Sequence, residues 1–109
     1  MNAWLMLSIA IVSEVAATAS LRASQGFSRL APSIVVVIGY GVSFFLLSQV
    51  LKTMPVGMVY AIWSAVGIAV LAILGKMVWG DPLPPLAIAG LVLIIGGIVV
   101  LRVAVGTVE

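Results

Sequence analysis

Four long apolar stretches occupy most of this 109-residue chain, and they constrain its fold more than any other feature. Each is roughly 20 residues long, which at 1.5 Å per helical residue spans the ~30 Å hydrocarbon core of a bilayer. Backbone groups in lipid must be hydrogen-bonded internally, so each stretch should be helical. The chain is therefore predicted to be an all-α integral membrane protein with four transmembrane helices, at about residues 3–21, 33–51, 55–76 and 83–102.

The residues between the apolar stretches are too few to form a domain outside the membrane. Only 7% of the residues are charged, against about 25% in ordinary soluble domains, and the segments between the apolar stretches are short. We therefore expect a single four-helix transmembrane domain over residues 1–109. The net charge of +2 does not indicate a nucleic-acid partner. Four helices of this size enclose little space, so a substrate cavity should require at least two copies of the chain.

Two missing residue types exclude most enzymatic chemistry. The chain has no cysteine and no histidine, which rules out Ser-His and Cys-His nucleophilic pairs as well as thiolate and imidazole metal ligands. We therefore predict that the protein is not an enzyme and has no metal site.

One acid, Glu14, interrupts the first apolar stretch near its middle. A charged residue at that depth costs at least ~2.5–3.5 kcal/mol on insertion scales. Acids retained at that position usually handle protons or ions, although a permanently protonated hydrogen bond between helices is an alternative. Glu14 is thus the predicted binding residue for protons and for a cationic substrate.

Small, hydroxylated and aromatic side chains are predicted to surround this carboxylate. The residues one turn from Glu14 on the first helix are small or hydroxylated, so the acid should lie in a groove. Aromatic faces attract organic cations, most strongly where water is excluded; alternatively, these rings only pack helices together. The predicted pocket residues are Ala10 and Thr18 on the first helix, Tyr40, Ser43 and Phe44 on the second, and Tyr60, Trp63 and Ser64 on the third.

Glycines in the fourth stretch are candidates for close helix packing. Gly90 and Gly97 lie seven residues apart, and therefore on one helix face after two turns. Small residues let transmembrane backbones approach each other, so we predict a dimerisation role for this face. The alternative is that glycine is simply frequent in membrane helices.

Three motifs resemble those of the small multidrug resistance family of bacterial proton-coupled exporters. They are Ser13-Glu14-Val15, Gly26-Phe27-Ser28-Arg29-Leu30 followed by Pro32-Ser33, and Tyr60-Ala61-Ile62-Trp63-Ser64 with Gly67. The resemblance covers nearly the whole chain. It implies a four-helix protomer in an antiparallel dimer, in which Glu14 of each copy binds protons and substrate in competition. It also implies that Tyr60 and Trp63 line a pocket shared by the two copies.

Two positions bear on the subtype within that family. Guanidinium exporters of the family typically carry a tryptophan three residues after the glutamate, where this chain has Ala17. A small residue there resembles the exporters of quaternary ammonium compounds and other lipophilic cations. Ala65 stands where the family often has a glycine before a kink in the third helix, which leaves Gly67 as the candidate hinge.

Together these features predict a proton-coupled antiporter that exports hydrophobic and quaternary ammonium cations, a multidrug efflux protein of the bacterial plasma (inner) membrane. Burial favours a neutral carboxyl group, whereas a bound cation favours the ionised group, so the two ligands should displace each other. Protons are the expected coupling ion, and no cofactor is expected. The alternatives are a guanidinium-type exporter of the same family and a non-transporting assembly subunit of a larger membrane complex.

The basic residues give little indication of which way the chain inserts. Lys52 and Arg102 would share one side of the membrane, and Arg22, Arg29 and Lys76 the other. The positive-inside rule has little to act on in so even a distribution. We therefore predict dual topology and an antiparallel homodimer; a heterodimer with a paralogous chain is the alternative.

Overall fold

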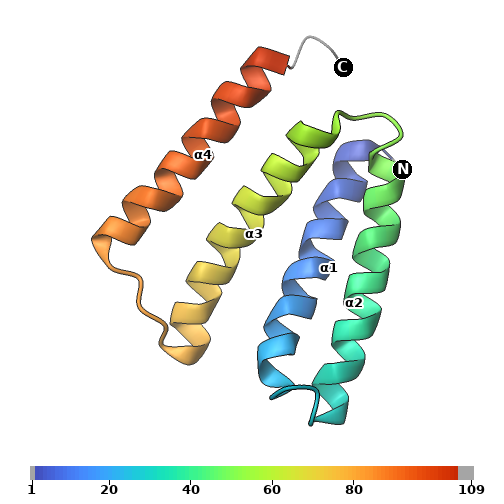
Figure 1. The fold of residues 1–109 in the computed structure, drawn as a ribbon, viewed down its shortest axis with the longest axis vertical. Helices are drawn as coiled ribbons and strands as arrows, with labels where there is room; N and C mark the ends of the chain where they lie inside the picture. Colours follow the sequence, from blue (N-terminus) through green and yellow to red (C-terminus); the bar gives the residue numbers. More distant parts are fainter. Residues whose placement is uncertain (1, 106–109) are drawn as a thin grey trace. The chain divides into compact units, whose positions relative to one another are not determined.

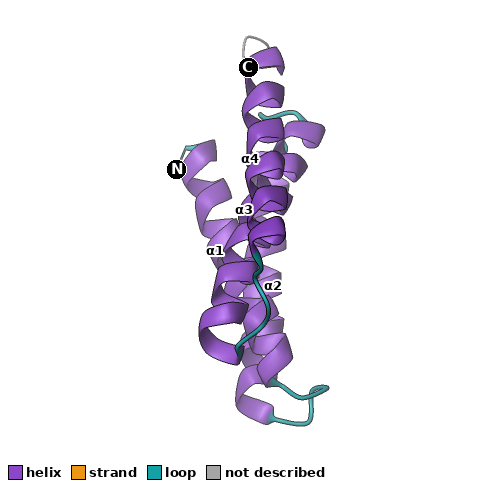
Figure 2. Ribbon diagram, turned by 90° about the vertical axis from the view of Figure 1, so that its left-hand side faces the viewer, coloured by secondary structure: helices purple, strands orange, loops and turns teal. Residues whose placement is uncertain are grey.

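The computed structural model describes residues 2–105, which form four α-helices joined by short loops (Figure 1). α1 spans Ala3–Ala23, α2 spans Leu30–Val50, α3 spans Val56–Trp79 and α4 spans Pro85–Val105. All four helices are long and apolar enough to cross a membrane. Figure 2 shows only helices and loops over the described residues. The prediction of an all-α protein with four transmembrane helices is confirmed.

The chain divides between Thr53 and Met54 into two compact helical hairpins. The first consists of α1 packed against α2, and the second of α3 packed against α4. In each hairpin the two helices run in opposite directions (Figure 1). That residues 1–109 form one domain stays a prediction.

The helix ends differ from the predicted ones by a few residues, for identifiable reasons. α2 begins at Leu30 and not at residue 33, so that Pro32 lies within its first turn. Proline is tolerated there because the first N–H groups of a helix have no intrahelical acceptor to lose. α3 and α4 continue past Lys76 and Arg102, which lie in their last turns. A cation is favoured there by the helix dipole, and its long side chain can reach toward water.

Two of the helix ends have identifiable capping residues. The side chain of Asn2 accepts a hydrogen bond from the backbone N–H of Leu5 at 2.9 Å, which makes it the N-cap of α1. α3 ends at Gly80, whose φ of 71° is the left-handed conformation common after a helix C-terminus. Asn2 thus marks the start of α1 at Ala3, and Gly80 the end of α3 at Trp79.

The loop between α1 and α2 is built around Ser24, which is fully buried. Its hydroxyl accepts a hydrogen bond from the N–H of Phe27, and its carbonyl oxygen accepts one from the N–H of Ser28. Residues 25–27 all have positive φ, between 49° and 73°. This left-handed turn reverses the chain tightly and returns α2 alongside α1.

Candidate functional site

The carboxylate of Glu14, in the middle of α1, is held by a side chain one turn further along the same helix. The Thr18 hydroxyl donates a hydrogen bond to Oε1 of Glu14 at 2.8 Å. Residues four apart on a helix face the same way, so this contact follows directly from the sequence spacing. The second carboxylate oxygen, Oε2, is buried and has no hydrogen-bond partner among the residues that the structure describes. Because burying an unsatisfied acceptor is costly, Oε2 is the oxygen that needs a ligand.

Tyr40 of α2 extends this contact across the hairpin. Its phenolic oxygen lies 2.6 Å from the hydroxyl oxygen of Thr18. Its ring stacks on that of Phe44, with the ring centroids 6.0 Å apart and the planes inclined by 15°. Four of the predicted site residues, Glu14, Thr18, Tyr40 and Phe44, therefore form one connected set within the first hairpin.

Two more predicted pocket residues lie in the interface between α1 and α2. Ala10 and Ser43 are fully buried, and the Ser43 hydroxyl donates a hydrogen bond to the carbonyl oxygen of Ala10 at 2.8 Å. The hydroxyl proton of Ser43 is thus used in joining the two helices. Their assignment to a substrate pocket stays a prediction.

Gly39, which the sequence pattern did not single out, allows α1 and α2 to approach closely. A Cβ placed on Gly39 would lie 2.8 Å from the Cβ of Ala17 and 3.0 Å from the carbonyl oxygen of Ser13. Both distances are shorter than ordinary van der Waals contact, so only glycine fits without displacement. The small side chains near Glu14 therefore allow α2 to pack directly against α1. On the side of α1 that faces α2, the expected open groove is closed.

The aromatic residues predicted on the third helix share one stripe of α3. Tyr60, Trp63 and Ser64 follow at helical spacing, with Gly67 one turn beyond. Trp63 is 8% exposed, whereas Tyr60 is 69% exposed. α3 is continuous through Ala65 and Gly67, both buried. That Tyr60, Trp63 and Ser64 line the same pocket as Glu14, and that Gly67 is a hinge, stay predictions.

The small-residue face of α4 is open in the part of the chain that the structure describes. A Cβ at Gly90, Gly96 or Gly97 would meet no atom within 4 Å, and no residue of α4 is buried. Space is therefore available for another helix against this face. A dimer contact at Gly90 and Gly97 stays a prediction.

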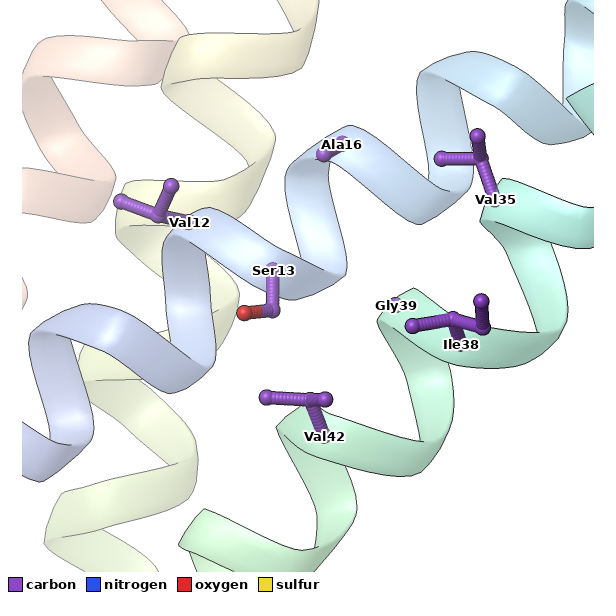
Figure 3. A pocket seen from close by; sticks show the side chains of 7 residues that line it. All are labelled: Val12, Ser13, Ala16, Val35, Ile38, Gly39 and Val42. Carbon is purple, nitrogen blue, oxygen red and sulfur yellow. The ribbon is translucent and has the colours of Figure 1, made fainter.

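An apolar cavity of about 340 Å³ lies between α1 and α2 (Figure 3). Val12 and Ala16, which line it from α1, are two residues from Glu14 and so lie roughly 160° around the helix from it. The cavity is therefore separate from the carboxylate, and its lining holds no ionisable side chain, which makes it unsuited to binding protons or cations. The lining residues are Val12, Ser13, Ala16, Val35, Ile38, Gly39 and Val42.

The connected set of Glu14, Thr18, Tyr40 and Phe44 is suited to reversible binding, because it combines one carboxylate with two hydroxyls and two aromatic rings. The carboxylate can take a proton or pair with a cation, the hydroxyls orient it, and ring faces attract organic cations. Within residues 2–105, no group of three or more His, Cys, Asp or Glu could hold a metal ion.

Comparison with known proteins identifies the family. The family described as Small Multidrug Resistance protein matches residues 2–94. "Quaternary ammonium compound-resistance protein QacE" of Escherichia coli is 48% identical over 102 residues, which cover 94% of this chain and 93% of that protein. "Quaternary ammonium compound-resistance protein QacF" of Klebsiella aerogenes and "Multidrug transporter EmrE" of Escherichia coli are 44% and 41% identical, with the same coverage. As its motifs predicted, the chain belongs to the Small Multidrug Resistance family, and it is a multi-pass protein of the bacterial inner membrane.

Proposed function

We propose that this protein is a proton-coupled antiporter that exports quaternary ammonium and other hydrophobic cations. One observation carries the proposal: the transmembrane carboxylate of Glu14 keeps one oxygen, Oε2, buried and without a hydrogen-bond partner among the described residues. Such an oxygen is stabilised either by a proton or by a cation. The names of the relatives, which refer to quaternary ammonium compound resistance and multidrug transport, support the substrate class.

Exchange at Glu14 follows from electrostatics. In a site without water, the ionised carboxylate needs a cation beside it, whereas the protonated form has no charge with which to hold one. Binding of a cation therefore releases the proton, and binding of a proton releases the cation. Alternating access of the site to the two sides of the membrane turns this competition into antiport.

The proposed pocket needs aromatic side chains as well as the carboxylate. Tyr40 and Phe44 stack within the first hairpin, and Phe44 is 56% exposed. We assign Tyr60 and Trp63 of α3 to the same role, because a desolvated ring face attracts cations that carry little hydration. A cavity that encloses a cation of this size calls for two copies, and the open glycine face of α4 supports their packing.

The environment of Ala17 favours lipophilic cations over guanidinium as substrates. Ala17 is fully buried, and a Cβ placed on Gly39 of α2 would lie only 2.8 Å from the Ala17 Cβ. A tryptophan at this position, as is typical of guanidinium exporters, would not fit this contact. A lipophilic cation can use the aromatic surface of Tyr40 and Phe44 instead. The relatives bear names of resistance and transport proteins, and we propose no enzymatic activity.

Proton release on substrate binding tests the proposal. Purified protein in weakly buffered detergent solution is titrated with tetraphenylphosphonium and, separately, with guanidinium. We expect protons to be released by tetraphenylphosphonium, much less release by guanidinium, and none from Glu14→Gln. Asp81→Asn is the matched control, because it removes a carboxylate outside the helices and should behave like wild type. Equal release from Glu14→Gln would refute the proposal, and a preference for guanidinium would refute the substrate class.

A further inference from the structure

The two carboxylate oxygens of Glu14 are held differently. Oε1 accepts a hydrogen bond from Thr18, and the Thr18 hydroxyl in turn contacts the hydroxyl of Tyr40 on the other helix. Oε2 is buried with no partner among the described residues. If the two oxygens were equivalent, a proton or cation could bind to either one. Because they are held differently, one of them should be the preferred binding atom.

The direction of the hydrogen bonds can be derived from the number of protons available. An ionised carboxylate only accepts, so Thr18 must donate its single hydroxyl proton to Oε1. Thr18 then has only lone pairs left for the 2.6 Å contact with Tyr40, so Tyr40 must be the donor there. The chain therefore runs from the Tyr40 hydroxyl through the Thr18 hydroxyl to Oε1.

We propose that Tyr40 and Thr18 form a directed hydrogen-bond chain that holds Oε1 of Glu14, so that protons and cations exchange at Oε2. The identity of these exchanging ligands rests on the proposed function, but the hydrogen-bond chain itself does not. Thr18 is then a positioning residue, because it acts on the substrate only through Glu14.

Protonation at each oxygen has different consequences for the chain. A proton on Oε2 leaves Oε1 as a carbonyl-type acceptor, and both hydrogen bonds keep their direction. A proton on Oε1 would have to be donated to Thr18, which would reverse the chain and require a new acceptor for the Tyr40 hydroxyl. Protonation of Oε2 therefore leaves the direction of both hydrogen bonds unchanged.

Among the described residues of the first hairpin, the charged side chains other than Glu14 lie away from this position along the helices. The titratable residue that α2 places next to the Glu14 and Thr18 pair is Tyr40 itself. Arg22 lies in the last turn of α1, and Arg29 and Lys52 lie outside the helices, all at the ends of the hairpin. Within this hairpin, the hydrogen bonds from Tyr40 to Thr18 and from Thr18 to Glu14 orient the carboxylate.

Variants that change only hydroxyl groups test the chain. Thr18→Val replaces the hydroxyl with a methyl group of similar size, Thr18→Ser keeps the hydroxyl, and Tyr40→Phe keeps the ring that stacks on Phe44. The first readout is the infrared band of the Glu14 carboxylate in protein labelled with ¹³C at the glutamate carboxyl carbons, isolated by subtracting the Glu14→Gln spectrum. The second is the affinity for tetraphenylphosphonium at fixed pH.

We expect Thr18→Val to shift the carboxylate band and Thr18→Ser to restore it. A hydrogen bond to an ionised acceptor is stronger than one to a neutral acceptor by about 1 kcal/mol, so Thr18→Val should weaken cation binding about fivefold in competition with protons. Tyr40→Phe should change both readouts in the same direction but less. A double variant of Thr18→Val and Tyr40→Phe should match Thr18→Val alone, because Tyr40 acts through the Thr18 hydroxyl.

Two results would overturn this inference. One is a carboxylate band in Thr18→Val that matches wild type, and the other is full additivity of the two substitutions. The infrared measurement does not require transport, so it tests the hydrogen-bond chain even if tetraphenylphosphonium does not bind the wild-type protein. Failure of the wild-type protein to bind tetraphenylphosphonium would count against the proposed function alone.

Discussion

Gly39 of α2 faces Ala17 of α1 so closely that a methyl group on Gly39 would lie 2.8 Å from the Ala17 Cβ. The next residue on each helix belongs to the candidate site: Thr18 follows Ala17, and Tyr40 follows Gly39. The 2.6 Å contact between their hydroxyl oxygens therefore depends on the helix separation that glycine permits. The close packing of Ala17 against Gly39 therefore also brings Thr18 and Tyr40 together in the site.

Gly39→Ala should force α1 and α2 apart and weaken both the hairpin and the site. Overpacking of this kind typically costs about 1–3 kcal/mol, and the separated helices should also lose affinity for tetraphenylphosphonium. Gly41→Ala is the matched control, since a Cβ on Gly41 would meet nothing within 4 Å. Unfolding in mixed micelles and ligand titration measure the two effects. Equal behaviour of the two alanine variants would show that the close approach at Gly39 is unimportant.

Ser43→Ala should lower the free energy of unfolding by about 0.6 kcal/mol, the average measured for hydrogen bonds between membrane helices. The substitution removes the 2.8 Å hydrogen bond to the carbonyl oxygen of Ala10, which crosses from one helix to the other. Ser48→Ala serves as the control, because the Ser48 hydroxyl bonds to the carbonyl oxygen of Phe45 within its own helix. If both variants lose the same stability in micelles, the hydrogen bond between helices adds nothing.

The fold could be predicted from the sequence because lipid leaves few alternatives. An apolar stretch of about 20 residues has to be helical in a bilayer, so four stretches indicate four helices. The helix ends are harder to predict: Lys76 and Arg102 are the predicted boundaries, but both lie within the last turns of α3 and α4. A single cation does not end a helix, because it is favoured in the last turn by the helix dipole.

The contacts of the site were only partly accessible from the sequence. Glu14 and Thr18 could be paired because they are four residues apart on one helix. Nothing in the pattern fixes the register of α2 against α1, so the bond from Thr18 to Tyr40 and the closing of the groove by Gly39 required the structure. The small residues Ala17 and Gly39 were a signal for close packing that could have been used.

Trp63→Ala should weaken the binding of aromatic and quaternary cations without preventing assembly. Loss of a desolvated cation–π contact costs about 2 kcal/mol, or roughly thirtyfold in affinity. Trp79→Ala is the control, since Trp79 lies about four turns further along α3, at its end. Affinity for tetraphenylphosphonium is measured on protein of verified oligomeric state. An unchanged affinity in Trp63→Ala would show that Trp63 only packs the helices. The same measurement on Tyr60→Phe tests whether the Tyr60 hydroxyl contributes to cation binding.

The orientation of the protein in the membrane depends on how its few basic residues are distributed. Four successive membrane crossings would put Lys52 and Arg102 on one side and Arg22, Arg29 and Lys76 on the other. So small an excess of basic residues gives the positive-inside rule little to act on. The wild-type chain should therefore insert both ways, and two opposed copies would form the inverted repeat typical of transporters.

Reporters fused to the C-terminus test this prediction, which concerns a tail that lies outside the described residues. We expect signal from both sides of the membrane for the wild-type protein. Two or three arginines added after the last residue should shift nearly all copies into one orientation and abolish export. Co-expression with a variant locked in the opposite orientation should restore export, since the pair again supplies two opposed copies. A wild-type reporter found on one side only would exclude an antiparallel homodimer and favour a paralogous partner chain.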